Sequence, residues 1–326
     1  MQQKALTGII DDSGKLAPSY AYKKLRLIRR VEEKIERLYP SDKVKSPVHL
    51  SIGQEAVAVG VCSALEETDV VFSNYRGHAH YLAKGGDLNA MWAELYGKSN
   101  GGSGGIGGSM HLDCWDKGFM CTSAIVASGI PNAAGFALAN LMKNDPRLTV
   151  CFHGDGATEE GVFWETLNFA SLKNLPILFI CENNRYAIYS HQSARMKSDN
   201  IVERAQAFGL KAERVRGEST QDFFEATLNA SEAIKNGSGP ILLECMTHRW
   251  RDHVGPGEDR HLSYRDNTEL DKAIAQDELT EIRNKLPKEE VREIDEAVET
   301  EIQTAIEFAE NGTFPKAEEL LKNVWA

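Results

Sequence analysis

Two short polar motifs follow consecutive predicted strands in the middle of this 326-residue chain, and they constrain its fold more than any other feature. Gly154-Asp-Gly156 follows an apolar run over 148–153, and Asn183-Asn184 follows a second such run over 176–181. The segment between them, 160–173, has the length and pattern of a helix. A right-handed β-α-β crossover makes the two strands parallel, so both motifs emerge at the edge where open α/β sheets bind ligands.

The residue types in these motifs indicate a magnesium diphosphate site. Asp155 and Asn184 offer a carboxylate and an amide oxygen, which suit Mg²⁺, a hard cation that leaves positions free for phosphate oxygens and water. The flanking glycines let the backbone approach the phosphates. Taken alone, Gly154-Asp-Gly156 is also typical of a tight turn that caps the following helix.

The remaining patterns predict a doubly wound α/β fold, with a mostly parallel sheet and helices on both faces. A helical N-terminal extension over 1–45, an α/β domain over 46–265 and a helical C-terminal segment over 266–326 are expected. The N-terminal helix, 20–38, is expected on the outside of the domain. Other helices are expected over 54–66, 87–96, 131–143, 201–208, 220–235 and 271–310, and other strands over 69–72, 211–215 and 240–247.

Composition excludes several classes of protein. The chain has 37 basic and 48 acidic residues, a net charge of −11, which disfavours nucleic acid as a partner. With 42% hydrophobic residues it can bury a large core. Its six cysteines form no Cys-x-x-Cys pair and indicate reduced thiols, and no window reaches the roughly 18 apolar residues of a membrane span. Without a signal sequence, and with Asp11 and Asp12 arguing against a mitochondrial presequence, a cytoplasmic location is expected.

A glycine-rich loop over 100–109 contains a formal G-x-G-x-x-G at 102–107. The residues before it are helical, so the strand-turn-helix context of a dinucleotide site is missing. The loop is instead expected to become ordered when a ligand or partner arrives.

The two polar motifs, within 154–161 and 181–189, resemble the thiamine diphosphate motif of the alpha subunit of 2-oxo acid dehydrogenases, the pyruvate and acetoin type. Coverage runs from about residue 20 to the end. The resemblance implies the thiamine diphosphate-binding fold, the cofactors thiamine diphosphate and Mg²⁺, and oxidative decarboxylation of pyruvate or a related 2-oxo acid, or cleavage of acetoin. Further blocks resemble the family in the same order, at 27–33, 48–56, 74–80, 107–111 and 123–126.

Site residues follow from the resemblance. The implied magnesium ligands are Asp155, the side chain of Asn184 and the backbone carbonyl of Tyr186. His253 matches a loop histidine implicated in passing the acyl group to a lipoyl acceptor, and an imidazole ordinarily titrates near working pH. The other residues implied to contact the cofactor are Tyr75, Arg76, Ala124, Val126, Gly156 and Ala157.

Two of these side chains have alternative interpretations. An Arg76 fork suits phosphate oxygens, although a surface ion pair is the other reading. His78 matches a family histidine that could reach a substrate carboxylate, and an ordinary buried, hydrogen-bonded histidine fits equally well. His153 is expected to be a core residue at the end of its strand.

The chain also departs from the family pattern. Ala124 and Ala127 stand where relatives often have glycine, which changes the width of the cavity. The segment 251–254 lacks the serine used for kinase control in some relatives, so no such regulation is expected although Ser263 is present. Arg249 and Arg251, with His253, make a cationic loop that would favour a charged or phosphorylated substrate.

The implied partners complete the chemistry. In this family a separate beta subunit supplies the glutamate that activates the cofactor, and no segment here resembles that subunit, so an α₂β₂ assembly with a lipoyl-bearing acyltransferase is expected. Two alternatives remain open. One is a carboligase or transketolase-like enzyme without a lipoyl partner, and the other is an inactive scaffold subunit.

Overall fold

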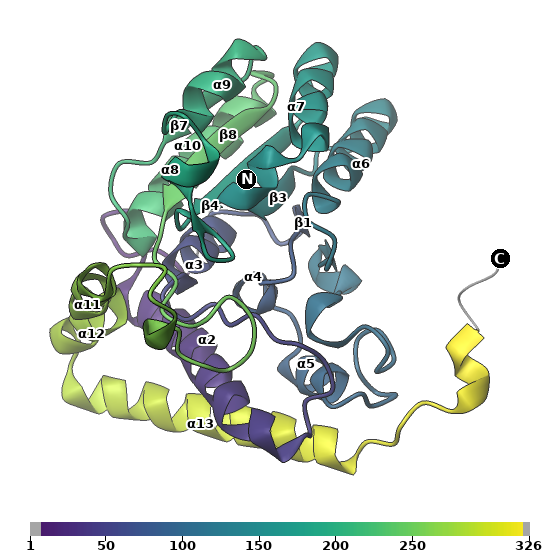
Figure 1. Ribbon diagram of the computed structural model, residues 1–326, viewed down its shortest axis with the longest axis vertical. Helices are drawn as coiled ribbons and strands as arrows, with labels where there is room; N and C mark the ends of the chain where they lie inside the picture. The colour runs from purple at the N-terminus through teal and green to yellow at the C-terminus, as the bar shows by residue number, and fades with distance from the viewer. Residues whose placement is uncertain (1–7, 322–326) are drawn as a thin grey trace.

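A six-stranded parallel sheet forms the centre of the computed structural model, which describes residues 8–321 (Figure 1). A separate two-stranded antiparallel hairpin, β5 (Tyr186–Ala187) and β6 (Ser190–His191), follows β4. Every neighbouring pair in the main sheet is parallel, so all six carboxyl ends lie on one edge. The strand order is β2 (Phe119–Cys121), β1 (Val70–Phe72), β3 (Thr149–Gly154), β4 (Ile177–Asn183), β8 (Ile241–Met246) and β7 (Lys211–Arg214).

Helices cover both faces of this sheet, which confirms the predicted fold class. Successive residues of a strand point to opposite faces, and alternate residues of β3 and β4 accordingly enter two different apolar clusters. Val150 and Leu178 pack with α3 (Glu55–Ser63), α4 (His78–Ala83) and α10 (Thr220–Lys235). Cys151 and Phe179 pack with α6 (Gly129–Lys143), α7 (Gly161–Lys173) and α9 (Ile201–Ala207).

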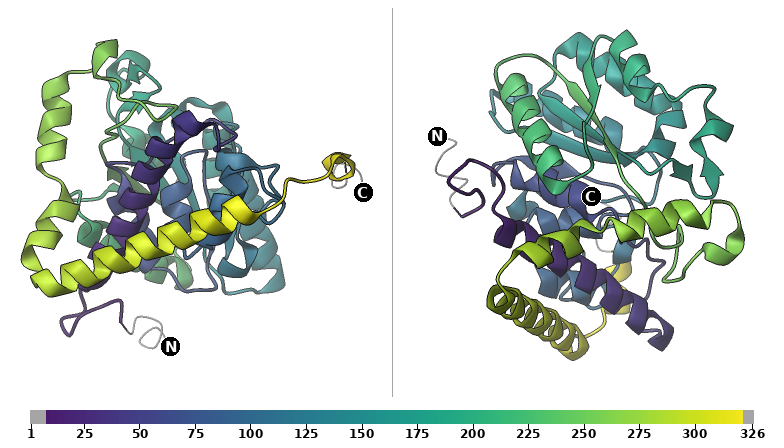
Figure 2. Two further views of the ribbon diagram at one scale, coloured as in Figure 1. Left: turned by 90° about the horizontal axis from the view of Figure 1, so that it is seen from below. Right: turned by 90° about the vertical axis from the view of Figure 1, so that its left-hand side faces the viewer.

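The terminal helices add a further layer to the first of these faces. Helix α2 (Pro18–Leu38) contacts α3 and α4 on one side, and α12 (Glu278–Lys285) and α13 (Lys288–Asn311) on the other. Figure 2 shows the long α13 crossing beneath α2 toward α5 (Leu88–Leu95). The expectation that the N-terminal helix lies on the outside is wrong, because Val31 and Ile35 are fully buried in the core shared with the sheet.

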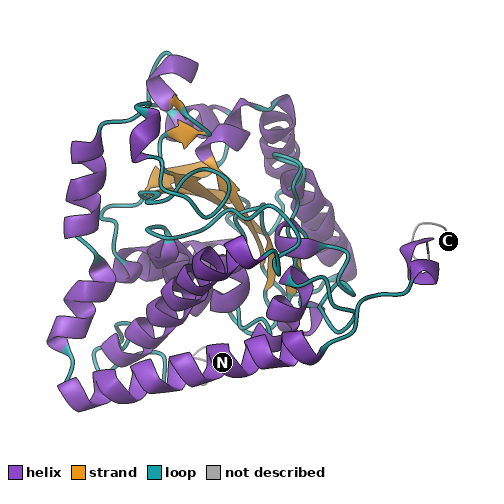
Figure 3. Ribbon diagram, turned by 60° about the horizontal axis from the view of Figure 1, so that its bottom comes forward, coloured by secondary structure: helices purple, strands orange, loops and turns teal. Residues whose placement is uncertain are grey.

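The other elements are mostly short (Figure 3). The helical stretch expected over 271–310 is three helices, α11 (Asn267–Ala275), α12 and α13, and Pro287 separates the last two. Helix α8 (Gln192–Arg195) has four residues. None of the described helices is long and apolar enough to cross a membrane. Single 3-10 turns occur at Tyr39–Ser41, Gly108–Met110, Trp115–Lys117, Asp155–Glu159, Arg260–Leu262 and Ala317–Leu321.

A buried carboxylate holds the glycine-rich loop in place. Glu94, at the end of α5, is 1% exposed, and its two oxygens accept hydrogen bonds from four backbone N–H groups. Those groups belong to Ser103, Gly105, Gly107 and Gly108, at 2.7–2.9 Å. The expectation that this loop waits for a ligand or partner to order it is therefore wrong, since the chain supplies its own anchor.

Candidate functional site

The two polar motifs meet at the carboxyl edge of the sheet. Gly154 is paired with Glu182 in the parallel register of β3 and β4, so the residues that follow these strands emerge side by side. A cavity of about 240 Å³ opens between them. Among the residues that line it are Asp155, Gly156, Ala157, Asn184 and Tyr186.

Asp155 is a buried carboxylate whose partner is a cation. The residue is 1% exposed, and burial raises the pKa of its carboxyl group while the guanidinium of Arg195 opposes that rise. Arg195 Nη2 lies 2.5 Å from Asp155 Oδ2. The same guanidinium also pairs with Glu159. The site therefore already balances the charge of Asp155 with a positive group.

Asn184 is oriented by two hydrogen bonds. Its Oδ1 accepts from the backbone N–H of Tyr186 at 3.0 Å, and its Nδ2 donates to Gln54 Oε1 at 2.8 Å. The first bond fixes which end of the amide is the oxygen, because a backbone N–H can only donate. An amide oxygen has a second lone pair, so Oδ1 remains able to bind a cation while it accepts from Tyr186.

The donors at this edge fit Mg²⁺ held with a diphosphate. A carboxylate, an amide oxygen and a backbone carbonyl are hard oxygen ligands, and their small number leaves positions for phosphate oxygens and water. Close approach is built into Gly156, because a Cβ there would lie 2.9 Å from the Cβ of Ala187 in the hairpin. Glycine at position 156 thus lets the hairpin approach the turn that carries Asp155.

One wall of the cavity is basic and aromatic. Arg76 is 7% exposed and donates to the carbonyls of Leu50 at 2.7 Å and His253 at 2.9 Å. Burial, with the nearby Arg249, lowers the pKa of Arg76 to about 10. Arg76 is therefore not a surface ion pair, and both it and Tyr75 line the cavity.

His49 packs behind this wall, against Tyr75 and His253, and sequence reasoning gave it no role. Its ring centroid lies 4.5 Å from that of Tyr75 and 5.2 Å from that of His253. A β-bridge between His49 and Gly255 brings the two chain segments together. Burial first, then Arg76, lowers the pKa of His49 to about 3, and burial with Arg76 lowers that of His253 to about 3 as well. The only sequence signal was the position of His49 inside the family-like block at 48–56.

The structure does not bring every candidate residue to the cavity. Val126 lines it, whereas Ala124 stands behind it with its N–H 3.5 Å from His111 Nε2. His78 is fully buried in a network, with Nδ1 2.9 Å from Glu32 Oε2 and Nε2 2.8 Å from Ser109 Oγ. This position matches the alternative reading of a buried, hydrogen-bonded histidine.

Strained backbone gathers around the cavity. Ala127, Arg185 and Ile188 adopt left-handed conformations with φ of 63°, 67° and 54°. Such values are rare for residues with a Cβ, and rarest for a β-branched residue such as Ile188. Strain of this kind persists where the surrounding structure fixes it, commonly at functional sites. The positive φ of Ala127 also explains why glycine suits that position.

The cations of the long loop are paired within the chain. Arg249 is 2% exposed and donates to the hydroxyl of Tyr264 at 2.6 Å and to the carbonyl of Ile188 at 3.1 Å. Arg251 pairs with Glu36 of α2 at 3.1 Å. The expectation that these arginines favour a charged or phosphorylated substrate is not supported, because their donors serve the fold.

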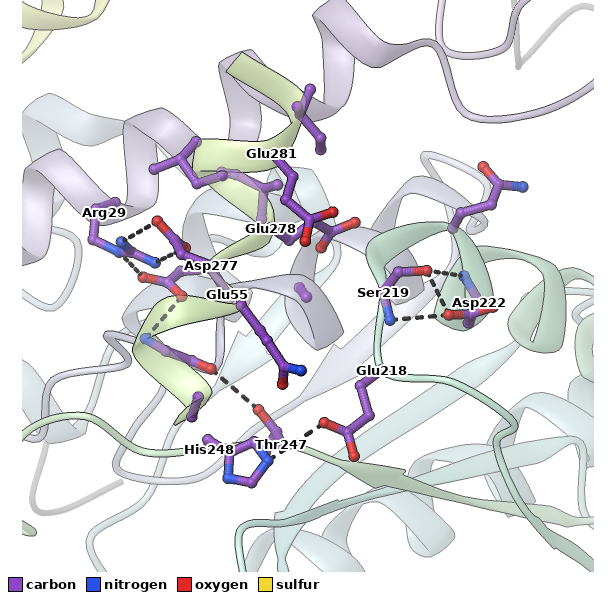
Figure 4. Close-up of a pocket in the computed structure, with 18 of the residues that line it drawn as sticks. Arg29, Glu55, Glu218, Ser219, Asp222, Thr247, His248, Asp277, Glu278 and Glu281 are labelled. Carbon is purple, nitrogen blue, oxygen red and sulfur yellow. Dashed lines mark hydrogen bonds and ion pairs between the residues drawn. The ribbon is translucent and has the colours of Figure 1, made fainter. Parts of the chain in front are cut away.

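A second hollow, of about 460 Å³, lies between α2, α10 and α12 (Figure 4). Its charged groups satisfy one another. Arg29 pairs with Glu55 and Asp277, and Glu278 accepts from the backbone N–H of Thr220 at 3.0 Å, at the start of α10. These contacts join helices to one another, so we interpret the hollow as a structural junction between helices.

Comparison with known proteins agrees with this geometry. The sequence profile of the family described as "Dehydrogenase E1 component" matches residues 23–318. The alpha subunit of acetoin:2,6-dichlorophenolindophenol oxidoreductase from Bacillus subtilis is 37% identical over 311 residues, covering 94% of this chain and 92% of its own. The pyruvate dehydrogenase E1 component subunit alpha from Rhizobium meliloti is 33% identical over 324 residues, covering 97% and 92%.

These relatives confirm the resemblance drawn from the sequence, to alpha subunits of the pyruvate and acetoin type. The match spans almost the whole chain, including both motifs at the sheet edge and the helices on either side. The chain belongs to the dehydrogenase E1 component family.

Proposed function

We propose that this chain is the alpha subunit of a thiamine diphosphate-dependent dehydrogenase that acts on pyruvate, a related 2-oxo acid or acetoin and passes the acyl group to a lipoyl acceptor. The observation that carries the proposal is the meeting of Asp155, Asn184 and Tyr186 at one cavity. A relative at 37% identity acts on acetoin by its name, and one at 33% is named for pyruvate.

In this proposal the cation site consists of Asp155, the Oδ1 of Asn184 and the carbonyl of Tyr186, with Mg²⁺ as the metal. The diphosphate would lie against Gly156 and Ala157, with Tyr75, Arg76 and His253 on the opposite wall. Arg76 and His253 supply donors to phosphate oxygens, and burial makes those bonds stronger than they are in water. Val126 holds the far end of the cofactor.

Thiamine diphosphate, when bound, supplies the carbon nucleophile and the electron sink for cleavage beside a carbonyl. The chain's own residues position and shield. His253 and His49 are uncharged near neutral pH because their pKa values lie near 3, so each imidazole can accept a proton at one nitrogen and donate from the other. His78 would take no direct part, because its buried ring is bonded to Glu32 and Ser109.

The partners belong to the same proposal. A beta subunit would supply the glutamate that activates the cofactor, in an α₂β₂ assembly, and a lipoyl-bearing acyltransferase would accept the acyl group. The proposed location is the cytoplasm.

The test is dye-linked turnover of the chain co-purified with its beta subunit, with Mg²⁺ and thiamine diphosphate, across pyruvate, branched 2-oxo acids and acetoin. We expect one substrate to reduce the dye. Asp155→Asn should cut Mg²⁺-dependent turnover by about a hundredfold or more. Asp145→Asn, in the connection between α6 and β3, should keep it. Equal turnover of wild type and Asp155→Asn would disprove the site.

A further inference from the structure

The guanidinium of Arg195 lies against Asp155, where a bound cation would also lie. Its side chain is 8% exposed, and its guanidinium contacts the buried Asp155 carboxylate, whose side chain is 2% exposed. Asp155 is also the carboxylate to which we assign the metal, so this inference rests on the proposed function. Arg195 stands on α8, forty residues further along the chain and outside the two polar motifs.

Asp155 carries one negative charge, and a bound metal would have to share it with Arg195. Magnesium–oxygen ligand distances are about 2.1 Å, so a metal on either oxygen of Asp155 would lie within about 5 Å of the guanidinium in a buried site. Like charges repel strongly at such separations where water is excluded. A guanidinium that leaves Asp155 can still pair with Glu159, which contacts its other terminal nitrogen and whose side chain is 36% exposed.

The guanidinium also ties the metal site to the hairpin. Arg195 Nε donates to the carbonyl of Ser190 at 3.0 Å, and Nη2 lies 3.4 Å from the carbonyl of Arg185. These carbonyls flank Tyr186, whose own carbonyl is a proposed metal ligand. Any displacement of Arg195 from Asp155 therefore changes contacts of the segment that completes the metal site.

We propose that Arg195 is an internal counter-cation that competes with Mg²⁺ for Asp155, so that metal binding requires the guanidinium to leave that carboxylate and α8 to shift. The pair with Arg195 satisfies the buried carboxylate until a cation with greater charge arrives. The apparent metal affinity is then lowered by the share of molecules in which Arg195 holds Asp155.

Binding of Mn²⁺, followed by electron paramagnetic resonance, tests the competition. The protein is the full-length chain co-purified with its beta subunit, with saturating thiamine diphosphate. Arg195→Gln should lower the Mn²⁺ Kd by about tenfold, the value of one buried charge-assisted hydrogen bond. Arg195→Lys keeps the charge but loses the planar fork that reaches both carboxylates, and it should lower the Kd by about threefold. Lys197→Gln, which removes an exposed neighbouring charge, should leave the Kd unchanged.

The variants separate competition from other roles. If Arg195→Lys binds Mn²⁺ no more tightly than wild type while Arg195→Gln does, only the field of the charge acts and the competition is refuted. If Arg195→Gln weakens thiamine diphosphate binding without tightening Mn²⁺, the arginine holds the diphosphate, and the proposal is again wrong. If the wild-type protein binds no Mn²⁺, both the proposed metal site and the competition are wrong. Wild-type binding that Asp155→Asn abolishes and no Arg195 variant alters would leave the site standing and reject only the competition.

A second measurement follows the movement in the native background. A nitroxide attached at Ala194→Cys, an exposed position on α8, should change its mobility when Mg²⁺ and thiamine diphosphate are added. A nitroxide at Glu301→Cys, on the exposed side of α13, should not change. An unchanged spectrum at position 194 in protein that has bound Mn²⁺ would contradict the proposal.

Discussion

His49 and His253, beside the cavity, stay uncharged at acidic pH values at which a histidine exposed to water would be protonated. His49 is 7% exposed and lies among Tyr75, Arg76 and His253, and the positive groups add to the effect of burial. Its pKa of about 3 means that the folded protein keeps this imidazole neutral well into the acid range. The positive side chains near the cavity can thus bind a negatively charged group, while the histidines remain uncharged.

This arrangement predicts a pH dependence of stability. Below about pH 6.5 the unfolded chain protonates His49, whereas the folded chain does so only near pH 3, so stability is lost as the pH falls through that window. We expect His49→Asn to reduce the loss of unfolding free energy between about pH 7 and about pH 5 by roughly 1 kcal/mol, after allowance for partial exposure. Urea unfolding at both pH values measures it, with the exposed His261→Asn as control. An undiminished loss would show that His49 is protonated in the fold.

At the residue scale, sequence predicted the groups that lie inside short motifs. Asp155, Asn184 and Tyr186 directly follow two strong strand patterns, and topology alone brings them together. His49 and Arg195 were missed because their roles depend on chain segments that approach from elsewhere. His49 acquires its neighbours through the bridge to Gly255, and Arg195 reaches Asp155 from a four-residue helix that has no periodic signal.

At the element scale, the glycine loop shows how one side chain can replace regular structure. Glu94 takes four backbone N–H groups that would otherwise need water or a ligand. The loop in turn places Ser109 against His78, and the carbonyl of Gly107 lies 3.1 Å from His111 Nδ1, next to the Ala124 segment. Through the loop, Glu94 therefore supports the contacts of His78 and His111.

Glu94→Gln should loosen this loop. An amide has one acceptor oxygen where the carboxylate has two, and its NH₂ group would face backbone donors, so we expect a loss of about 2 to 3 kcal/mol in unfolding free energy. Hydrogen exchange should show faster exchange at the amides of 103–108. Glu165→Gln on the exposed side of α7 provides the matched control. Unaltered protection at 103–108 would mean that the glycine loop does not depend on the carboxylate.

Most regular elements were predicted from their patterns, including the short strands β1 and β7, but the helix α4 and the hairpin β5–β6 were not. The strands β3, β4 and β8 and the helices α7 and α10 follow the expected ranges within a few residues, because each carries a full apolar face. The hairpin β5–β6 has two residues in each strand, too few for any alternation to be visible. The glycine loop was misjudged for a related reason, since its anchor lies in the preceding helix and looks like an ordinary surface glutamate.

At the scale of the whole molecule, helices α2 and α13 pack together over one face of the sheet. Tyr22 and Arg26 of α2 both reach Asp295 of α13 at 2.8 Å, and the apolar residues between them are buried. The charged face of α2 suggested an outside position because a sequence pattern cannot show that its charges meet a second charged helix. Helices α2 and α13 thus form a layer over one face of the sheet, and the core on that face extends from Tyr22 to Ala309.

One apolar cluster joins α13 to the sheet, so we expect these two parts to unfold together. Ile302 of α13 is 1% exposed and belongs to the same cluster as Leu178 and Ile180 of β4, the strand that leads into Asn183-Asn184. Ile302→Ala should cost about 3 kcal/mol of unfolding free energy, through lost burial and the cavity left behind. Native-state hydrogen exchange should show the same loss at the most protected amides of β4 as at those of α13, whereas Gln303→Ala on the exposed face should show neither. A loss confined to α13 would instead make that helix a separately opening unit, and the cavity would then draw no stability from it.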